Sequence, residues 1–571
     1  MNKQTLLSLP TPFTPGGWEA YPRPQMVRDS YFPLGGVWQL SVRSARGEEP
    51  LGGITMPYVP ESPLSGISRT LADGEAWIYR RRFTLPDDFG DGRVLLHFGA
   101  VDQYAAVTLN GIDLGEHAGG YLPFSFDITD ALAAGENLLT VTVRDPLDHD
   151  LGWGKQRRDR GGMWYTPVSG IWQPVWMECV PEGYISALRI TPTLDAVTIE
   201  ADGGGGALTL TVETPEGEVV RTFTKRITLP IESPRLWTPE DPYLYRFTLT
   251  DGRDTVRSYF ALRTITVETR GKRQYICLNG APYFFHGVLD QGYYSDGIFL
   301  PASPEGYRHD IGMLKSLGFN MLRKHIKREP ECFYYECDRM GMIVFQDMIN
   351  SGGYSFLIDT ALPTIGPRRG ITHRASKRRR AFFEAETAGI VESLYNHPCV
   401  CYYTIFNEGW GQFDADANYR RLKSLDPTRV WDATSGWFHE KESDVQSEHV
   451  YFKKLDLRES ARPLVLSEFG GYVCRIDGHI ANPAKAYGYK TIADRDALTA
   501  SLEALYLGEV VPMLSRGLNA AVLTQLSDVE DEINGLVTYD RQVTKPDAAR
   551  MRGIAQKLAE TFDNEVKICQ S

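Results

Sequence analysis

Hydrophobic and polar residues alternate in the first 265 residues in the way that β-strands require. Runs such as AAVTLNG (105–111) and NLLTVTVRD (137–145) place apolar side chains at every second position, and turn residues separate the runs. Asn110-Gly111 is a strong signal for a two-residue hairpin turn. We therefore predict an N-terminal β-sandwich over residues 1–182 and a second sandwich of immunoglobulin size over residues 183–265.

The pattern changes after residue 265, where short apolar runs alternate with stretches of helical periodicity. This alternation is typical of βα units around a parallel sheet. The expected strands are 283–290, 319–325, 342–348, 400–408, 429–436, 447–452, 463–470 and 520–528. Eight strands over residues 266–571 predict a (β/α)8 TIM barrel, so the fold class is a multidomain chain that ends in a barrel.

Polar residues gather at the ends of these expected strands, where the active site of such a barrel lies. The set consists of Asp290, Arg323, His325, Asn407, Glu408, Glu468 and Gln525. A carboxylate that ends an apolar run is costly to bury unless it is paired or used. Two glutamates on the fourth and seventh strands suit retaining glycoside hydrolysis, which needs two carboxyl groups about 5–5.5 Å apart.

Several motifs in this order resemble glycoside hydrolase family 2, the β-galactosidase, β-glucuronidase and β-mannosidase family. FNEGWGQF (406–413) is similar to its acid/base signature, and LVLSEFGGY (464–472) is similar to its nucleophile signature. SGIWQPVWME (169–178) resembles the last strand of its N-terminal jelly-roll domain, and YICLNGAPYFFHGV (275–288) resembles the opening of its barrel. The resemblance covers nearly the whole chain.

The resemblance assigns roles to individual residues. It implies that Glu408 is the general acid/base and Glu468 the nucleophile, with Arg323 beneath the nucleophile. It also implies that Asn407 hydrogen-bonds the sugar 2-hydroxyl and that His325 faces the sugar. The expected activity is that of a retaining, exo-acting β-glycosidase, closest in type to a β-galactosidase, which works through a covalent glycosyl-enzyme.

Tyr451 ends the sixth expected strand, where its hydroxyl can serve as a donor to Glu468; a core tyrosine is the alternative interpretation. Trp410 is a candidate stacking face for the sugar, although a tryptophan after a strand can also pack within its loop. Gln525 stands where an aromatic platform is usual in the family.

The residues after the eighth strand bear on the sugar. β-Glucuronidases of this family carry an Asn-x-Lys pair that binds the substrate carboxylate, and here Glu532 and Asn534 occupy those positions. An anionic Glu532 would repel a uronate, which disfavours ordinary β-glucuronidase action.

A basic segment, GPRRGITHRASKRRR (366–380), leaves an acidic substrate as an alternative interpretation. It is either a solvated helix start or a cationic lid over the barrel rim, and arginine is suited to a bidentate carboxylate contact. The alternative function is therefore a β-hexuronidase, either a β-galacturonidase or a β-glucuronidase. An alternative of another class is a non-catalytic carbohydrate-binding protein, which would have no need of both glutamates.

Composition narrows the setting. A net charge of −12 disfavours a nucleic-acid partner, and the absence of an 18-residue apolar run disfavours a membrane span. Eight cysteines without a CxxC pair predict reduced thiols, and the first residues lack the apolar core of a signal peptide. We expect a cytoplasmic enzyme with a small carbohydrate or glycoconjugate substrate and neither cofactor nor metal. The resemblance adds a homo-oligomer as an expectation.

Overall fold

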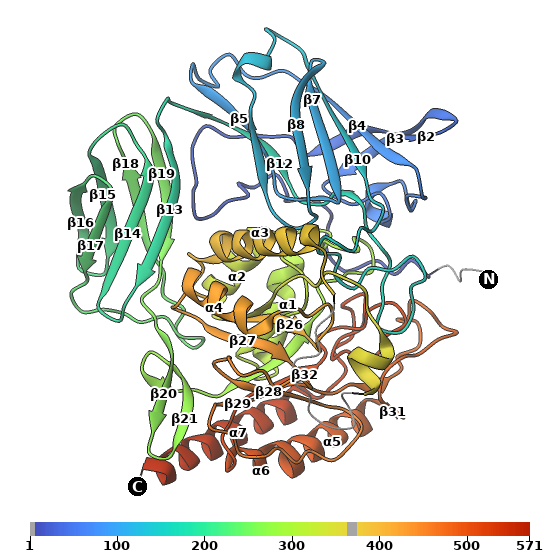
Figure 1. Ribbon diagram of the computed structural model, residues 1–571, viewed down its shortest axis with the longest axis vertical. Helices are drawn as coiled ribbons and strands as arrows, with labels where there is room; N and C mark the ends of the chain where they lie inside the picture. Colours follow the sequence, from blue (N-terminus) through green and yellow to red (C-terminus); the bar gives the residue numbers. More distant parts are fainter. Residues whose placement is uncertain (1–5, 363–373, 571) are drawn as a thin grey trace.

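The N-terminal strands form two antiparallel sheets packed face to face in the computed structural model, which describes residues 6–362 and 374–570 (Figure 1). One sheet has the order β3-β2-β4-β10-β7-β8 and the other β1-β12-β5-β9, while β6 pairs with β11. The bounds are β1 Phe32–Pro33, β2 Gly36–Ser44, β3 Gly47–Met56, β4 Ala76–Phe83, β5 Arg93–Phe98, β6 Val101–Asp102, β7 Tyr104–Leu109, β8 Ile112–Ala118, β9 Phe124–Asp127, β10 Asn137–Arg144, β11 Gly170–Ile171 and β12 Val175–Val180.

The alternation read from the sequence explains this sandwich. Leu139, Val141 and Val143 of β10 are fully buried between the sheets, and the residues between them are partly exposed. The expected hairpin joins β7 to β8, with positive φ angles of 54° at Asn110 and 82° at Gly111. Both angles lie in the region that a type I′ turn requires.

The second sandwich has seven strands in sheets of three and four, ordered β13-β14-β17 and β16-β15-β18-β19. Their bounds are β13 Ile185–Pro192, β14 Ala196–Gly203, β15 Leu208–Thr214, β16 Gly217–Phe223, β17 Arg226–Pro230, β18 Tyr245–Thr250 and β19 Thr255–Phe260. A buried ion network joins it to the first sandwich, because Arg28 contacts Glu178 at 3.0 Å and Asp254 at 2.8 Å.

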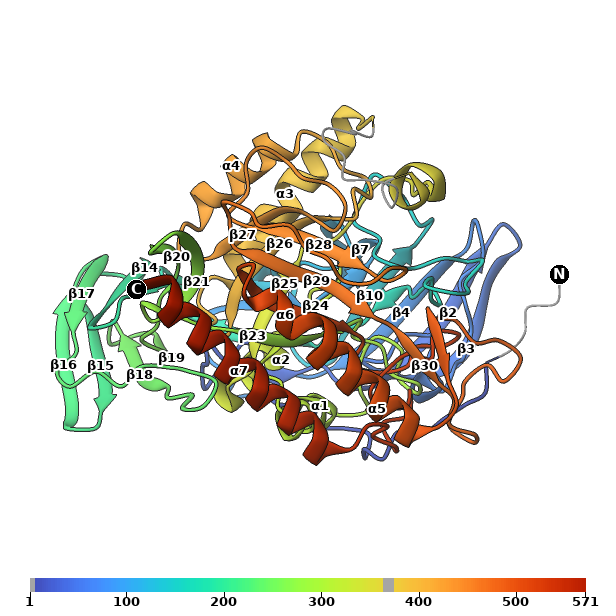
Figure 2. The ribbon, with the colours of Figure 1, turned by 90° about the horizontal axis from the view of Figure 1, so that it is seen from below.

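Eight parallel strands form the barrel, and α7 crosses beneath it (Figure 2). The order is β27-β26-β25-β24-β23-β32-β29-β28, and Ser447 Oγ of β28 donates to Thr434 O of β27 at 3.1 Å where the barrel nearly closes. The strand bounds are β23 Phe285–Asp290, β24 Met321–Lys324, β25 Ile343–Asp347, β26 Val400–Asn407, β27 Val430–Ser435, β28 Gln446–Val450, β29 Leu464–Gly470 and β32 Leu518–Thr524. The helices are α1 Glu305–Ser316, α2 Glu331–Met340, α3 Lys377–Leu394, α4 Ala415–Leu425, α5 Arg495–Leu505, α6 Val511–Leu514 and α7 Ala548–Gln570.

Smaller elements complete the barrel region. A three-stranded sheet precedes it, a short parallel pair lies near the rim, one π-helical turn follows β25, and a second lies between α5 and α6. These elements are β20 Ile265–Arg270, β21 Arg273–Leu278, β22 Ala281–Pro282, β30 Tyr472–Cys474, β31 Lys490–Ile492, η3 Phe356–Ala361 and η5 Tyr506–Val510.

One connection of the first sandwich reaches the carboxyl rim of the barrel. We call it the rim loop, residues 145–169 between β10 and β11. Trp153 N donates to Asn350 O at 3.1 Å, beyond the end of β25, and Tyr165 Oη donates to Glu532 Oε2 at 2.5 Å, beyond the end of β32. The rim is therefore shared between two domains.

Two features bear on the expected setting. All eight cysteines are free thiols. The segment Arg495–Leu514 is long and apolar enough to cross a membrane by length and composition, but Leu498, Leu502 and Val510 within it are buried in the core around the barrel.

Candidate active site

Glu468 lies near the end of β29, and Arg323 of β24 lies directly against it. Arg323 is 1% exposed, and its Nη1 donates to Glu468 Oε1 at 3.1 Å. The same guanidinium donates to Asp347 Oδ1 at 2.9 Å and to Asn407 Oδ1 at 2.9 Å. Arg323 therefore ties together the ends of β24, β25, β26 and β29, which fixes the carboxylate of Glu468 in place.

Glu408 follows β26 in a strained backbone conformation. Its φ angle is +53°, a region that costs a non-glycine residue about 1–2 kcal/mol. Gly409 and Gly411 follow with positive φ angles, and a Cβ on Gly409 would lie 2.3 Å from the ring of Phe438. The chain can therefore turn at this point only with glycine next to Glu408, and the turn sets the direction of its carboxylate.

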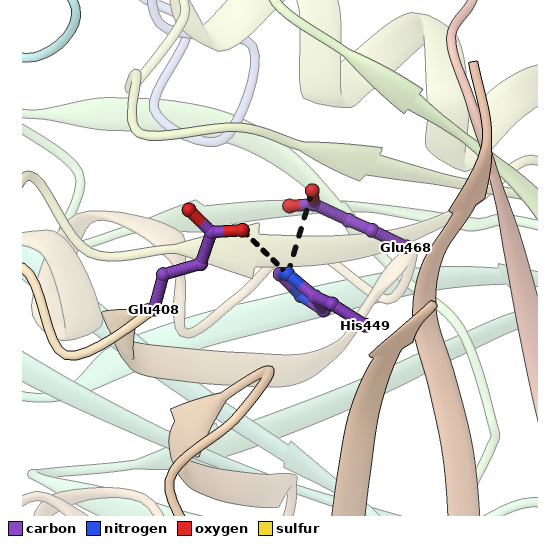
Figure 3. Close-up of side chains that lie close together, drawn as sticks. All are labelled: Glu408, His449 and Glu468. Atoms are coloured by element: carbon purple, nitrogen blue, oxygen red, sulfur yellow. Dashed lines mark hydrogen bonds and ion pairs between the residues drawn. The ribbon is translucent and has the colours of Figure 1, made fainter. Parts of the chain in front are cut away.

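His449 of β28 lies between the two glutamates (Figure 3). Its Nδ1 is 2.8 Å from Glu408 Oε1 and 3.5 Å from Glu468 Oε2. One atom of each of these three side chains lies within 4.8 Å of the other two. The two carboxylates are therefore close enough for both to act at a single atom of a ligand.

The environment keeps Glu468 ionised. Burial alone raises the pKa of this carboxyl, but the electrostatic interactions with His449 and Arg323 and the more distant Lys155 outweigh it and lower its pKa to about 2. Tyr451 adds a hydrogen bond, because its hydroxyl donates to Glu468 Oε2 at 2.6 Å. The donor contact expected for Tyr451 from the sequence is present.

Two further expected residues keep a free polar atom. Burial lowers the pKa of His325 to about 4, so its ring is neutral. With Nδ1–H donated to Asp347 at 2.7 Å, Nε2 is a buried acceptor that has no partner in the described part of the chain. Asn407 Oδ1 accepts from Arg323 and from Ser435 Oγ at 2.8 Å, and its Nδ2 has no hydrogen-bond partner among the described residues. Both residues therefore retain one group for a ligand.

Gln525, Asn534 and Glu532 lie in one hydrogen-bonded chain. Gln525 Nε2 donates to Asn534 Oδ1 at 2.8 Å, and Asn534 Nδ2 donates to Glu532 Oε1 at 3.1 Å. Tyr165 of the rim loop supplies the donor to the other oxygen of Glu532. Burial raises the pKa of Glu532, which favours its neutral form.

Asp290 has a different environment from the one expected for a sugar contact. Its Oδ2 accepts from Lys324 Nζ at 2.5 Å, and its Oδ1 accepts from Gly292 N at 2.8 Å. Both oxygens are therefore engaged within the protein, each with one donor. The structure places Asp290 in an ion pair with Lys324, and its contact with a substrate remains a prediction.

Trp410 packs within an aromatic cluster. It is 3% exposed, and its Nε1 donates to Gly352 O at 3.2 Å. Its ring packs edge to face on Trp153 and Trp164, with ring centroids 4.9 and 5.1 Å apart. The packing interpretation of Trp410 fits these contacts, and its stacking on a sugar remains a prediction.

The described part of the basic segment 366–380 is held by structural partners. Arg378 pairs with Asp148 at 2.6 Å, Arg380 pairs with Asp414, and the buried Arg379 donates to the carbonyl of Gly411. These contacts attach the start of α3 to the rim loop and to the turn after β26. Arg368, Arg369 and His373 lie outside the described residues.

Sequence reasoning missed three residues at this site. His449 could have been found, because it precedes Tyr451 by two positions and a strand places such residues on the same face. Tyr489, which stacks on Tyr451 with ring centroids 3.9 Å apart, lies in an irregular segment. Lys155 belongs to the first sandwich, and nothing in its own sequence indicates that it reaches the barrel.

Glu408, His449 and Glu468 also form a group whose spacing could hold a metal ion. The sequence predicts no metal site, and these three residues lie far apart along the chain. The ionised Glu468 and its arginine already account for the position of that carboxylate, so we interpret the group as a carboxylate pair with a shared histidine.

Three models of one protein family match successive parts of the chain. The glycosyl hydrolase 2 galactose-binding domain-like model matches residues 57–166, the glycosyl hydrolases family 2 model matches residues 184–263, and the TIM barrel domain model of that family matches residues 269–492. These matches cover most of the chain in the order of its three domains. The chain belongs to glycosyl hydrolases family 2, and the resemblance and fold class inferred from the sequence are confirmed.

Individual relatives differ in the sugar named for them. A β-galactosidase of Aeromonas hydrophila is 28% identical over 437 residues, which are 69% of this chain and 39% of that protein. The chain spans about two fifths of the length of the curated β-galactosidases it matches.

Two solved structures share the fold over nearly the full length of both chains. The β-D-glucuronidase for Dictyoglomus thermophilum has a TM-score of 0.73 at 19% identity and covers 95% of this chain and 98% of its own. The β-galacturonidase from Eisenbergiella tayi bound to galacturonate has a TM-score of 0.67 at 20% identity, with 93% and 97% covered.

Proposed function

We propose that the chain is a retaining, exo-acting β-glycosidase that hydrolyses a terminal β-linked sugar. The observation that carries this proposal is the pair Glu408 and Glu468, whose carboxylate oxygens lie within 4.8 Å of each other at the barrel rim. A separation of about 5–5.5 Å between carboxyl groups is typical of retaining glycosidases, and inverting enzymes need about 6.5–9.5 Å. A non-catalytic carbohydrate-binding protein would have no use for this spacing.

In the first step Glu468 attacks the anomeric carbon as the nucleophile. The bond from that carbon to the leaving oxygen breaks, and Glu408 gives its proton to the departing oxygen. The lowered pKa of Glu468 keeps the nucleophile ionised, and Arg323 and the Tyr451 hydroxyl hold its two oxygens.

In the second step water replaces the leaving group. Glu408, now ionised, takes a proton from the water. The oxygen of the water bonds to the anomeric carbon, and the bond between that carbon and Glu468 breaks. The sugar is released with its original configuration, and both carboxyl groups return to their starting protonation states.

Groups around the pair are suited to a sugar ring. The free Nδ2 of Asn407 is a donor next to Glu408, and the buried Nε2 of His325 is an acceptor for a hydroxyl. The substitutions at Glu532 and Asn534 favour a β-galactoside over a glucuronide. A β-hexuronide is the second candidate, because the unpaired cation of Lys155 lies close enough to act on the charge of Glu468.

The test uses 4-nitrophenyl β-glycosides and NMR of the first product. The β-anomer should appear before mutarotation, and a 2-deoxy-2-fluoro glycoside with a good leaving group should label a peptide that contains Glu468. Early appearance of the α-anomer, or a folded protein inert toward all β-glycosides, would contradict the proposal.

A further inference from the structure

Lys155 of the rim loop is held between the ends of two barrel strands. A Cβ on the preceding Gly154 would lie 3.4 Å from the carbonyl oxygen of Ile326, which directly follows His325. The carbonyl of Lys155 accepts from Tyr165 N at 3.0 Å, and the hydroxyl of Tyr165 is bonded to Glu532. The backbone of Lys155 is therefore fixed between the end of β24 and the segment after β32.

The charge of Lys155 has no partner within the described part of the chain. Its half-buried side chain makes neither a hydrogen bond nor an ion pair there, whereas the neighbouring cations of the loop are engaged. Arg157 lies over the ring of Trp164 at 4.5 Å, Arg158 pairs with Asp73, and Arg160 contacts Asp531 at 3.2 Å.

Three groups of the site respond to this cation. Lys155 lowers the pKa of Glu468, of His325 and of Glu532, which agrees with the position of its backbone between the end of β24 and the segment after β32. None of them is close enough to form an ion pair with it. A cation held among these groups without a carboxylate of its own is incompletely compensated, which is unfavourable in a partly buried position.

The two nearby carboxyl groups already have other partners. Glu468 is matched by Arg323 and Tyr451, and Glu532 accepts from Tyr165 and Asn534. Burial raises the pKa of Glu532, which weakens the repulsion of a uronate that the sequence suggested. The charge of Lys155 is therefore available to a ligand.

The positions of the two glutamates around the barrel indicate which part of a bound sugar would lie near Lys155. Glu408 follows β26, so the leaving group must lie on that side of the barrel. β32 is four strands away in the eight-stranded order, on the opposite side. A sugar whose anomeric carbon lies between the two glutamates can therefore extend its remote edge, which carries C4 to C6, toward Lys155.

We propose that Lys155 binds the C6 carboxylate of a hexuronic acid, so that the substrate is a β-hexuronide. This inference rests on the proposed glycosidase function. It assigns the carboxylate to a cation of the first sandwich, since position 534 of the barrel, where glucuronidases of the family carry lysine, is asparagine here. Charge-assisted hydrogen bonds to a buried carboxylate are strong enough to select it over a hydroxymethyl group.

The experiment compares four substrates that differ only at C4 and C6. These are the 4-nitrophenyl β-glycosides of galactose, galacturonate, glucose and glucuronate. For the wild type, at least one uronide should exceed its neutral counterpart in kcat/KM. Lys155→Met should lower kcat/KM for that uronide by about 10- to 100-fold and change the neutral sugar by less than about threefold, as expected for loss of a charged hydrogen bond.

Matched variants separate this role from a general one. Arg158→Met removes the same charge from the same loop at a site that pairs with Asp73, and it should leave the uronide preference unchanged. Lys155→Arg keeps the charge and should retain part of the preference, which also covers the case in which Lys155→Met fails to fold. Circular dichroism and thermal melting check each variant.

Two results would overturn the inference while leaving the glycosidase intact. One is a wild type that prefers the neutral sugar, or a galactoside with sulfate or phosphate at C6, over both uronides. The other is an equal loss on neutral and acidic substrates in Lys155→Met. A folded wild type that turns over none of the four also overturns the inference, whereas only inertness toward every β-glycoside would contradict the proposed function.

Discussion

Two buried ion networks start from adjacent residues of β24, and they differ in how they end. Arg323 points to one side of the strand and contacts Asp347 and Glu468. Lys324 points to the other side, because successive residues of a strand face opposite ways, and contacts Asp290 at 2.5 Å and Glu329 at 2.9 Å. All these side chains are buried.

The network of Lys324 is complete within the protein. Lys327 also contacts Glu329 at 3.0 Å, so two ammonium groups face two carboxylates. The network of Arg323 ends on Glu468 and leaves polar atoms open, namely Nε2 of His325 and Nδ2 of Asn407. Burial and pairing alone therefore do not distinguish a catalytic carboxylate from a structural one, whereas unused donors and acceptors beside it do.

The largest effect on activity should come from changing Glu468, at which the Arg323 network ends. Glu468→Gln removes the proposed nucleophile and should lower kcat by at least about 10⁴-fold, as expected when a nucleophile is lost. Steady-state assays on a chromogenic β-glycoside measure the loss, and a thermal melt confirms that the variant is folded. Wild-type turnover in a folded Glu468→Gln would refute the nucleophile assignment.

Breaking the network of Lys324, which we call the closed network, should lower the stability of the fold. Lys324→Met leaves Asp290 and Glu329 with less compensation and should lower the free energy of unfolding by about 3–5 kcal/mol, the usual cost of removing one partner of a buried ion pair. Urea denaturation measures this change. The kcat of the folded fraction should stay near that of the wild type, and a selective loss of kcat at unchanged stability would give the Lys324 network a catalytic role.

A smaller effect should come from the hydroxyl that supports the nucleophile. Tyr451→Phe removes the 2.6 Å hydrogen bond to Glu468 and should lower kcat by about 10- to 100-fold, the value of a hydrogen bond to a charged group. Tyr403→Phe is the matched control, because the buried Tyr403 hydroxyl has no hydrogen-bond partner among residues 6–362 and 374–570. Equal kinetics in the two variants would remove Tyr451 from the mechanism.

The smallest effect concerns the dependence of stability on pH. The pKa of Glu468 is lowered to about 2 in the folded chain, so its contribution is complete above the unfolded pKa near 4.5 and is lost as pH falls toward 2. Between pH 6 and pH 4 the stability difference between wild type and Glu468→Gln should therefore shift against the wild type by about 1 kcal/mol. Urea midpoints at both pH values measure it, and no shift would mean that Glu468 has an ordinary pKa.

Most of the fold could be predicted because each domain has its own periodicity. The eight barrel strands follow the apolar runs, and Glu408 and Glu468 were found because a charge at the end of such a run is conspicuous. Asp290 satisfied the same rule and proved to be part of the closed network, since its partner Lys324 lies on a different strand.

The remaining part of the site depends on contacts between distant segments. Lys155 and Glu532 lie 377 positions apart in the chain, and only folding of the rim loop onto the barrel brings them together. The periodicity of a single segment carries no information about such contacts. His449 is an intermediate case, because the two-residue period from Tyr451 predicts its face but not its position between two carboxylates.

The rim loop has a consequence for the order in which the molecule is assembled during synthesis. The first sandwich leaves the ribosome early and can fold as a unit, with its rim loop still lacking the barrel. Contacts of Tyr165 with Glu532 can form only after β32 and the following segment have been made. The site is therefore completed by the last strand of the barrel, so a nascent chain that stops before residue 518 holds both glutamates without a finished place for a sugar.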